Sequence, residues 1–205
     1  MNRDRQIEKI GKALGAARSA TAARDWATAV GANMRAERMI LRLQRVEPAE
    51  TEHVLVLGST CYDQALLWDR LGKGRQAVSA ARRAVWPYHF LDPSGGDPRR
   101  AREVLDAAGG DDAPAAARLM AHAADARARL ARLLAKYQHQ RRPGDASVID
   151  RYRGRSVAGE VELLGRDATG VYEALVEASH YGQDDLDRVR EQYRAALEHL
   201  RPVRE

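Results

Sequence analysis

Residues 54–85 constrain the fold more than any other stretch, because they predict two helices that fold back on each other. Apolar residues recur at three- and four-residue steps as far as Trp68, and the tight turn Leu71-Gly72-Lys73-Gly74 follows. A second helical stretch, Arg75–Val85, comes next, and Trp86-Pro87 is expected to end it. The pattern therefore predicts an antiparallel helical hairpin.

The same helical periodicity continues along the chain, and no stretch shows the sustained alternation that is typical of a strand. Further helices are expected over residues 4–23, 26–46, 114–140, 156–179 and 184–200. The sequence thus predicts an all-α fold with about six main helices and short connector helices. We expect a single domain, with two hairpins over residues 1–89, a connector over 90–113 and C-terminal helices over 114–205.

Several residues are of the types that begin or end helices. Expected N-caps are Asp25, Asp97 (with Pro98 at the first helical position) and Ser147, and Gly109 is expected to end the short helix of the connector. Three glycines, Gly159, Gly165 and Gly170, interrupt the pattern of residues 156–179. Because glycine weakens a helix, we expect these positions to lie where a neighbouring helix approaches closely.

Composition restricts the classes of protein to consider. No stretch approaches the roughly 20 apolar residues of a membrane span, and the charged N-terminus lacks the apolar core of an export signal. A single cysteine, Cys61, excludes an internal disulfide, and its place on an apolar stripe predicts a buried small hydrophobe. These features favour a cytoplasmic protein that is not associated with a membrane.

The net charge of +5 is unevenly distributed along the chain. Residues 118–155 hold ten lysines and arginines against three acids, whereas residues 156–205 hold six against eleven. The two parts are expected to attract each other within the fold, which would leave little net field for nucleic acid. An anion-binding face is one interpretation of the arginine bias, and a GC-rich coding sequence is the other.

Small residues recur with a fixed spacing around the predicted hairpin. They are Ala65, Ala77 and Ala84, accompanied by Trp68 and Leu71-Gly72, and the same spacing returns at Ala17, Ala29 and Ala36, with Asp25-Trp26 at the turn. A partial match covers the last helix, at Leu186, Val189, Tyr193, Ala196, Leu197 and Pro202. Over about half of its length the chain therefore resembles the tetratricopeptide-repeat proteins, although its two units lie 48 residues apart rather than 34. A plain helical bundle is the alternative architecture.

The resemblance implies a concave surface, lined by the first helix of each hairpin, that holds a peptide or a partner helix. In this chain that surface would include Arg18, Tyr62, Leu66 and Asp69. The lysine–asparagine clamp that the family uses for C-terminal carboxylates is not matched, since Leu14 and Arg18 stand in its place in the first unit. We therefore expect a non-enzymatic module that binds a protein partner, with ordinary packing as the alternative role for Tyr62 and Leu66.

Sequence signals for other chemistry are weaker. Arg194 and His199 resemble the arginine–histidine pattern of HEPN-type ribonucleases, so RNA binding or cleavage, together with the basic region 118–155, is a second hypothesis. Self-association through exposed hairpin ends is a third. No set of residues has the spacing of a metal site, and the glycine-containing loops lack the ending of a phosphate-binding loop, so we expect no cofactor.

Overall fold

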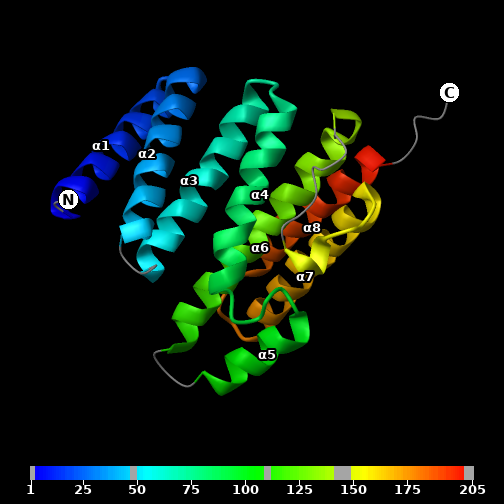
Figure 1. Ribbon diagram of the computed structural model, residues 1–205. Helices are drawn as coiled ribbons and strands as arrows, with labels where there is room; N and C mark the ends of the chain where they lie inside the picture. The colour runs from blue at the N-terminus through cyan, green and yellow to red at the C-terminus, as the bar shows by residue number, and fades with distance from the viewer. Residues whose placement is uncertain (1–2, 47–49, 109–111, 141–148, 201–205) are drawn as a thin grey trace. The chain divides into compact units, whose positions relative to one another are not determined.

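The structure, a computed structural model, describes residues 3–46, 50–108, 112–140 and 149–200 (Figure 1). Within these ranges the regular structure is entirely helical, which confirms the predicted all-α class. The chain divides into two compact units, Met1–Pro87 and Tyr88–Glu205. The residues expected to cap or end helices at Gly109 and Ser147 lie outside the described ranges. No described helix combines the length and the apolar character needed to cross a membrane.

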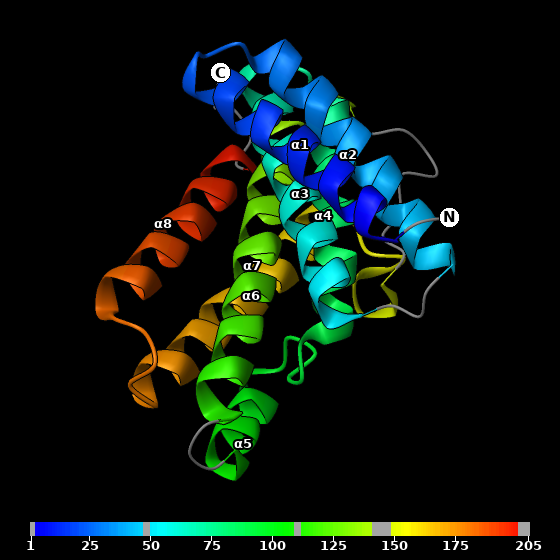
Figure 2. The ribbon, with the colours of Figure 1, turned by 90° about the vertical axis from the view of Figure 1, so that its left-hand side faces the viewer.

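The N-terminal unit consists of two helical hairpins. The first pairs α1 (Arg3–Ala22) with α2 (Trp26–Val46), and the second pairs α3 (Thr51–Arg70) with the part of α4 (Gly74–Leu91) that precedes Tyr88 (Figures 1 and 2). A shared apolar cluster joins them: Ile10, Ile40, Leu43, Leu57, Cys61 and Ala84. All four helices therefore contribute to one core.

The two hairpins turn in the same way. After α3, the Gly72 amide donates to the Asp69 carbonyl and the Lys73 amide donates to the Trp68 carbonyl, with Gly72 at φ +67°. After α1, the amides of residues 24 and 25 donate to the carbonyls of residues 21 and 20, with Arg24 at φ +59°. Both turns are Schellman motifs, and they lie 48 residues apart. Asp25 caps α2, as predicted, by accepting a hydrogen bond from the Thr28 amide at 3.0 Å.

Small side chains fill the positions where these helices pack. Ala17, Ala29, Ala36, Ala65, Ala77 and Ala84 are each at most 3% exposed. The second three follow the first three by 48 residues, which is also the spacing of the two turns. The two hairpins are therefore equivalent in both their turns and their buried alanines.

The expected end of the second hairpin is wrong, because α4 continues through Pro87 to Leu91. A proline inside a helix removes one hydrogen bond and crowds the preceding turn, at about 3 kcal/mol. The residues around it offset that cost by burial, since Val85 and Tyr88 are 1% and 5% exposed. The helix resumes its hydrogen bonding beyond the proline, where the Asp92 amide donates to the Tyr88 carbonyl.

The C-terminal unit is built around α6 (Asp112–Lys136). Helices α7 (Val157–Glu177) and α8 (Gln183–Leu200) pack on α6 and on each other, and the short α5 (Pro98–Ala107) packs on α7 and α6 (Figure 2). Two 3₁₀ turns, η1 (Gln138–Gln140) and η2 (Asp150–Tyr152), complete the regular secondary structure within the described ranges. Asp97 caps α5 with Pro98 in its first turn, as predicted.

Two of the three glycines in α7 lie where a neighbour approaches closely, as predicted. A Cβ atom on Gly165 would lie 2.1 Å from the Tyr193 ring of α8, and one on Gly170 would lie 2.3 Å from the Pro98 ring of α5. Gly159 differs, since the nearest atom to its Cβ would be the hydroxyl of Ser156, which caps α7. Glycine at residues 165 and 170 therefore sets how closely α8 and α5 approach α7.

Candidate binding groove

The N-terminal unit has a groove of about 250 Å³ between α1, the second half of α2 and the start of α3. Its lining residues are Arg3, Ile7, Ile10, Gly11, Leu14, Ile40, Leu43, Glu50, Glu52, His53 and Val56. The apolar members lie together, whereas the charged members come from the first residues of α1 and of α3 and from Glu50 just before α3. The groove thus has an apolar lining and a polar end.

Helical periodicity places the apolar side chains in the groove. On α1, Ile7, Ile10 and Leu14 follow at steps of three and four, so they share one face of the helix. Ile40 and Leu43 of α2 are 1% and 2% exposed and form the floor. Ile7 is 42% exposed, since no helix of the unit covers it completely. The groove therefore leaves part of a large apolar side chain open to a ligand.

The charges at the polar end are only partly compensated. One terminal nitrogen of Arg3 donates to both carboxylate oxygens of Glu50, at 2.9 Å each. His53 Nε2 lies 3.9 Å from the same carboxylate. The exposed Glu52 has no hydrogen bond or ion pair within the part of the chain that the structure describes. Once Arg3 and Glu50 offset each other, a neutral His53 leaves the groove with the negative charge of Glu52.

The four partner-binding residues expected from the sequence do not line this groove. Arg18 is exposed on α1 and lies one turn beyond Leu14, in line with the groove. Tyr62, Leu66 and Asp69 are partly buried on α3. At 3.6 residues per turn, the mean direction of these three lies about 120° around α3 from the mean direction of the groove-lining residues of that helix, and Leu66 is the nearest of them to the groove. Tyr62 packs against the apolar cluster of the unit.

A polar network lies inside the N-terminal unit and joins three helices. Glu37 of α2 accepts hydrogen bonds from Gln64 Nε2 of α3 and Arg83 Nε of α4, both at 2.8 Å. Cys61 is buried as predicted, and its thiol lies 3.6 Å from the Glu37 carboxylate. Burial and the nearby carboxylate raise the pKa of this thiol to about 12, so Cys61 is unreactive at neutral pH.

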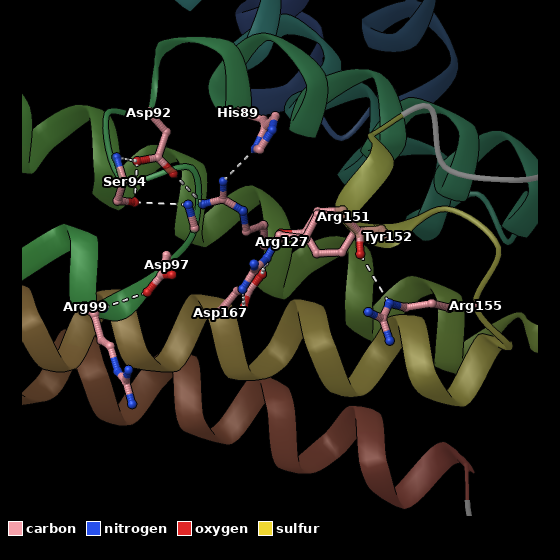
Figure 3. Close-up of polar contacts among 11 residues, drawn as sticks. His89, Asp92, Ser94, Asp97, Arg99, Arg127, Arg151, Tyr152, Arg155 and Asp167 are labelled. Atoms are coloured by element: carbon pink, nitrogen blue, oxygen red, sulfur yellow. Dashed lines mark hydrogen bonds and ion pairs between the residues drawn. The ribbon is translucent and has the colours of Figure 1, made fainter.

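The C-terminal unit contains a second polar network, shown in Figure 3. Arg127 of α6 donates to the Asp92 carboxylate at 2.7 Å, and neither side chain is exposed to solvent. Arg127 Nη2 also lies 3.2 Å from His89 Nδ1. Burial, followed by the positive charge of Arg127, lowers the pKa of His89. The Arg127 side chain is therefore held by groups from the end of α4 and the loop that follows it.

The C-terminal unit also contains an ion pair at η2. Arg151 donates to both oxygens of Asp167, at 2.6 and 2.7 Å, and the Tyr152 hydroxyl donates to this carboxylate at 2.9 Å (Figure 3). Burial raises the pKa of Tyr152, so its hydroxyl stays protonated. These contacts hold η2 against α7, which gives Arg151, Tyr152 and Asp167 a structural role.

The basic region 118–155 is partly neutralised within the fold. Arg127 pairs with Asp92, Arg151 with Asp167, and Arg153 with Asp150 at 3.2 Å. The pair between Arg151 and Asp167 is an example of the attraction that was expected between the basic and acidic parts of the sequence.

The residues of the ribonuclease hypothesis lie on α8. Arg194 and His199 are both exposed, but a separation of five residues on a continuous helix turns their side chains about 140° apart. His122 of α6, a lone histidine in an alanine-rich stretch, stacks on Tyr88 with ring centroids 5.6 Å apart. No cluster of potential metal ligands occurs among the described residues. RNA binding and cleavage stay predictions that a binding measurement against salt would test.

Scanning models of known protein families against this chain yields no match, and a search of curated proteins likewise yields none.

Proposed function

We propose that the N-terminal unit is a non-enzymatic interaction module that holds a segment of a partner protein in the groove between α1 and α3. The observation that carries this proposal is the groove itself, with its apolar lining and the 42% exposed Ile7. An exposed apolar side chain over a buried floor gains free energy when a partner covers it, at about 25 cal/mol per Å². The volume of about 250 Å³ suits a few side chains of a bound segment.

The repeated hairpin supports a tetratricopeptide-like architecture for this module. Two equivalent turns and two equivalent sets of buried alanines recur after 48 residues. In tetratricopeptide-repeat arrays the first helix of each hairpin lines the concave binding surface, and α1 and α3 are the first helices here. The groove lies between these two helices, which agrees with that arrangement.

The surface predicted from the sequence belongs to the same proposal as a second contact area. Arg18 continues the line of the groove along α1, so a segment longer than the groove would reach it. Tyr62, Leu66 and Asp69 present a different side of α3. A partner that contacts both areas would have to wrap around α3.

The test uses a phage-displayed library of short random peptides, selected on the immobilised full-length chain. Enriched peptides are then measured in solution against wild type, Ile7→Arg and Leu41→Arg. Leu41 is a matched control, because it is 41% exposed and does not line the groove. We expect Ile7→Arg to weaken binding about tenfold or more, which corresponds to about 1.4 kcal/mol, while Leu41→Arg leaves it unchanged.

Failure to enrich any peptide, or equal effects of the two substitutions, would overturn the proposal. Measuring the same peptides against a Tyr62→Ala, Leu66→Ala double variant tests the second area separately. Unchanged binding by that variant would remove Tyr62 and Leu66 from the contact surface and leave the groove in place. Circular dichroism of each variant verifies that the helices are retained.

A further inference from the structure

We infer that the segment bound in the groove carries a lysine or arginine next to its apolar side chains; this inference rests on the proposed function. Four titratable or charged residues line the groove, namely Arg3, Glu50, Glu52 and His53. Arg3 and Glu50 are bound to each other through two hydrogen bonds of 2.9 Å. Glu52 is the remaining carboxylate, and it is exposed.

The sign of this local charge is opposite to that of the whole protein. The chain carries a net charge of +5, so its overall field favours acidic ligands. At the polar end of the groove, however, one arginine faces two glutamates. Because exposed charges act mainly over about 10 Å at moderate salt, a ligand seated in the groove responds to Glu52 more than to distant arginines. The favoured ligand charge at this site is therefore positive.

The size and lining of the groove indicate which side chains lie beside the cationic one in the bound segment. Pockets for drug-sized molecules measure about 300–1,000 Å³, and the groove, at about 250 Å³, is smaller. Its apolar lining from α1, α2 and α3 accepts aliphatic or aromatic side chains, with the carboxylate at one end. An apolar side chain followed by a cationic one matches both parts of the groove.

The test compares two synthetic peptides that share one enriched sequence and differ only in carrying Lys or Glu at the position nearest the polar end. Exposed ion pairs change affinity by about twofold to fivefold. We expect wild type to prefer the Lys peptide by this factor at low salt, and the preference to shrink as salt is added. Glu52→Gln should abolish the preference, and Glu52→Lys should reverse it.

Glu103→Lys is the matched control, because it makes the same change in net charge at an exposed glutamate of α5. This variant should keep the wild-type preference. Wild-type preference for the Glu peptide, no preference, or a preference that survives Glu52→Lys would overturn the inference. Dimerisation that Ile7→Arg abolishes would assign the groove to a second copy of the chain and would also overturn it.

The two levels of the proposal fail in different ways. If the groove is not a binding site, no peptide binds or binding does not depend on Ile7. If only the inference is wrong, peptides bind in an Ile7-dependent way, but their charge has no effect. The substitution at Glu52 also removes an acid from the first turn of α3, so helix content is measured for each variant.

Discussion

At the scale of single residues, three helix ends share one backbone conformation with different amino acids. Gly72, Arg24 and Ser179 have φ values of +67°, +59° and +60°, and each follows the last turn of a helix. Glycine adopts this region at little cost, whereas a residue with a Cβ atom pays about 1–2 kcal/mol. The backbone is therefore strained at Arg24 and at Ser179, whereas it is not strained at Gly72.

Arg24→Gly should stabilise the N-terminal unit by about 1 kcal/mol. Gly72→Ala should destabilise it by a similar amount, because it introduces a Cβ atom at φ +67°. Urea unfolding followed by tryptophan fluorescence measures both, since Trp26, Trp68 and Trp86 all lie within Met1–Pro87. If Arg24→Gly lowers the midpoint, the strain assigned to this turn is wrong.

A second residue-scale prediction concerns His89. Its pKa lies below the ordinary value of 6.5, because burial and Arg127 disfavour the imidazolium. The unfolded chain therefore binds the proton more readily than the folded one. The stability that the neutral imidazole contributes is fully present above about pH 6.5, the unfolded value, and is lost as the pH falls below it.

His89→Gln should remove this part of the pH dependence, because the amide oxygen can accept from Arg127 without titrating. Thermal unfolding between pH 5 and pH 8 compares the two proteins, in the range where histidine changes charge. As the pH falls, the free energy of unfolding of wild type should decrease by more than that of His89→Gln. A difference that stays constant over this range would contradict the assignment.

At the scale of helices, close approach between α5 and α7 depends on Gly170. A Cβ atom there would lie 2.3 Å from the Pro98 ring, which is closed onto the backbone nitrogen at the start of α5 and so cannot rotate away. Gly170→Ala should therefore destabilise the C-terminal unit by about 1–3 kcal/mol, despite the better helix propensity of alanine.

Gly15→Ala provides the control for this substitution. Gly15 lies inside α1, and nothing stands within 4 Å of the position that its Cβ atom would take. There the propensity gain should dominate and stabilise by up to about 1 kcal/mol. Urea unfolding followed by circular dichroism compares the two variants. Effects of the same sign would show that propensity, rather than the contact with Pro98, decides the outcome at residue 170.

The helices show which structural features the sequence patterns predict and which they do not. Capping at Asp25 and Asp97 and the close approach at Gly165 and Gly170 were predictable, because each leaves a local signal in the sequence, either a capping side chain or a glycine inside a helical pattern. The continuation of α4 through Pro87 was not, because the burial of Val85 and Tyr88, which depends on packing in the folded chain, offsets the cost of the proline. Local preference fails where packing outweighs it.

The groove was missed for a related reason. Ile7, Ile10 and Leu14 form an apolar stripe, and periodicity cannot tell a covered stripe from an open one. Ile10 is 8% exposed and Ile7 42%, although they are one helical turn apart. The difference arises from where α3 begins relative to α1, which the sequence of α1 does not contain.

At the scale of the whole molecule, each of the two units has an apolar cluster and a polar network of its own among the described residues. Glu37, Gln64 and Arg83 lie in the N-terminal unit, and Asp92 and Arg127 lie in the C-terminal one. Asp92 and Arg127 are 35 residues apart, and the sequence offers no signal that pairs them. The charges within each network are matched locally, so damage to one network should affect mainly its own unit.

Asp92→Asn tests this separation. The substitution leaves the Arg127 guanidinium buried without its carboxylate, which should cost the C-terminal unit about 3–5 kcal/mol. Tryptophan fluorescence reports on the N-terminal unit alone, while circular dichroism reports on helices of both units. In Asp92→Asn, part of the helix signal in circular dichroism should therefore be lost at a lower urea concentration than in wild type. The midpoint of the fluorescence transition should stay close to that of wild type.

Cys61, buried in the N-terminal unit, gives a second readout, because its reaction with a thiol reagent under native conditions requires that unit to open. If fluorescence, circular dichroism and thiol labelling all shift together in Asp92→Asn, the two units unfold as one, and the stability of the groove would then depend on a buried ion pair in the other unit.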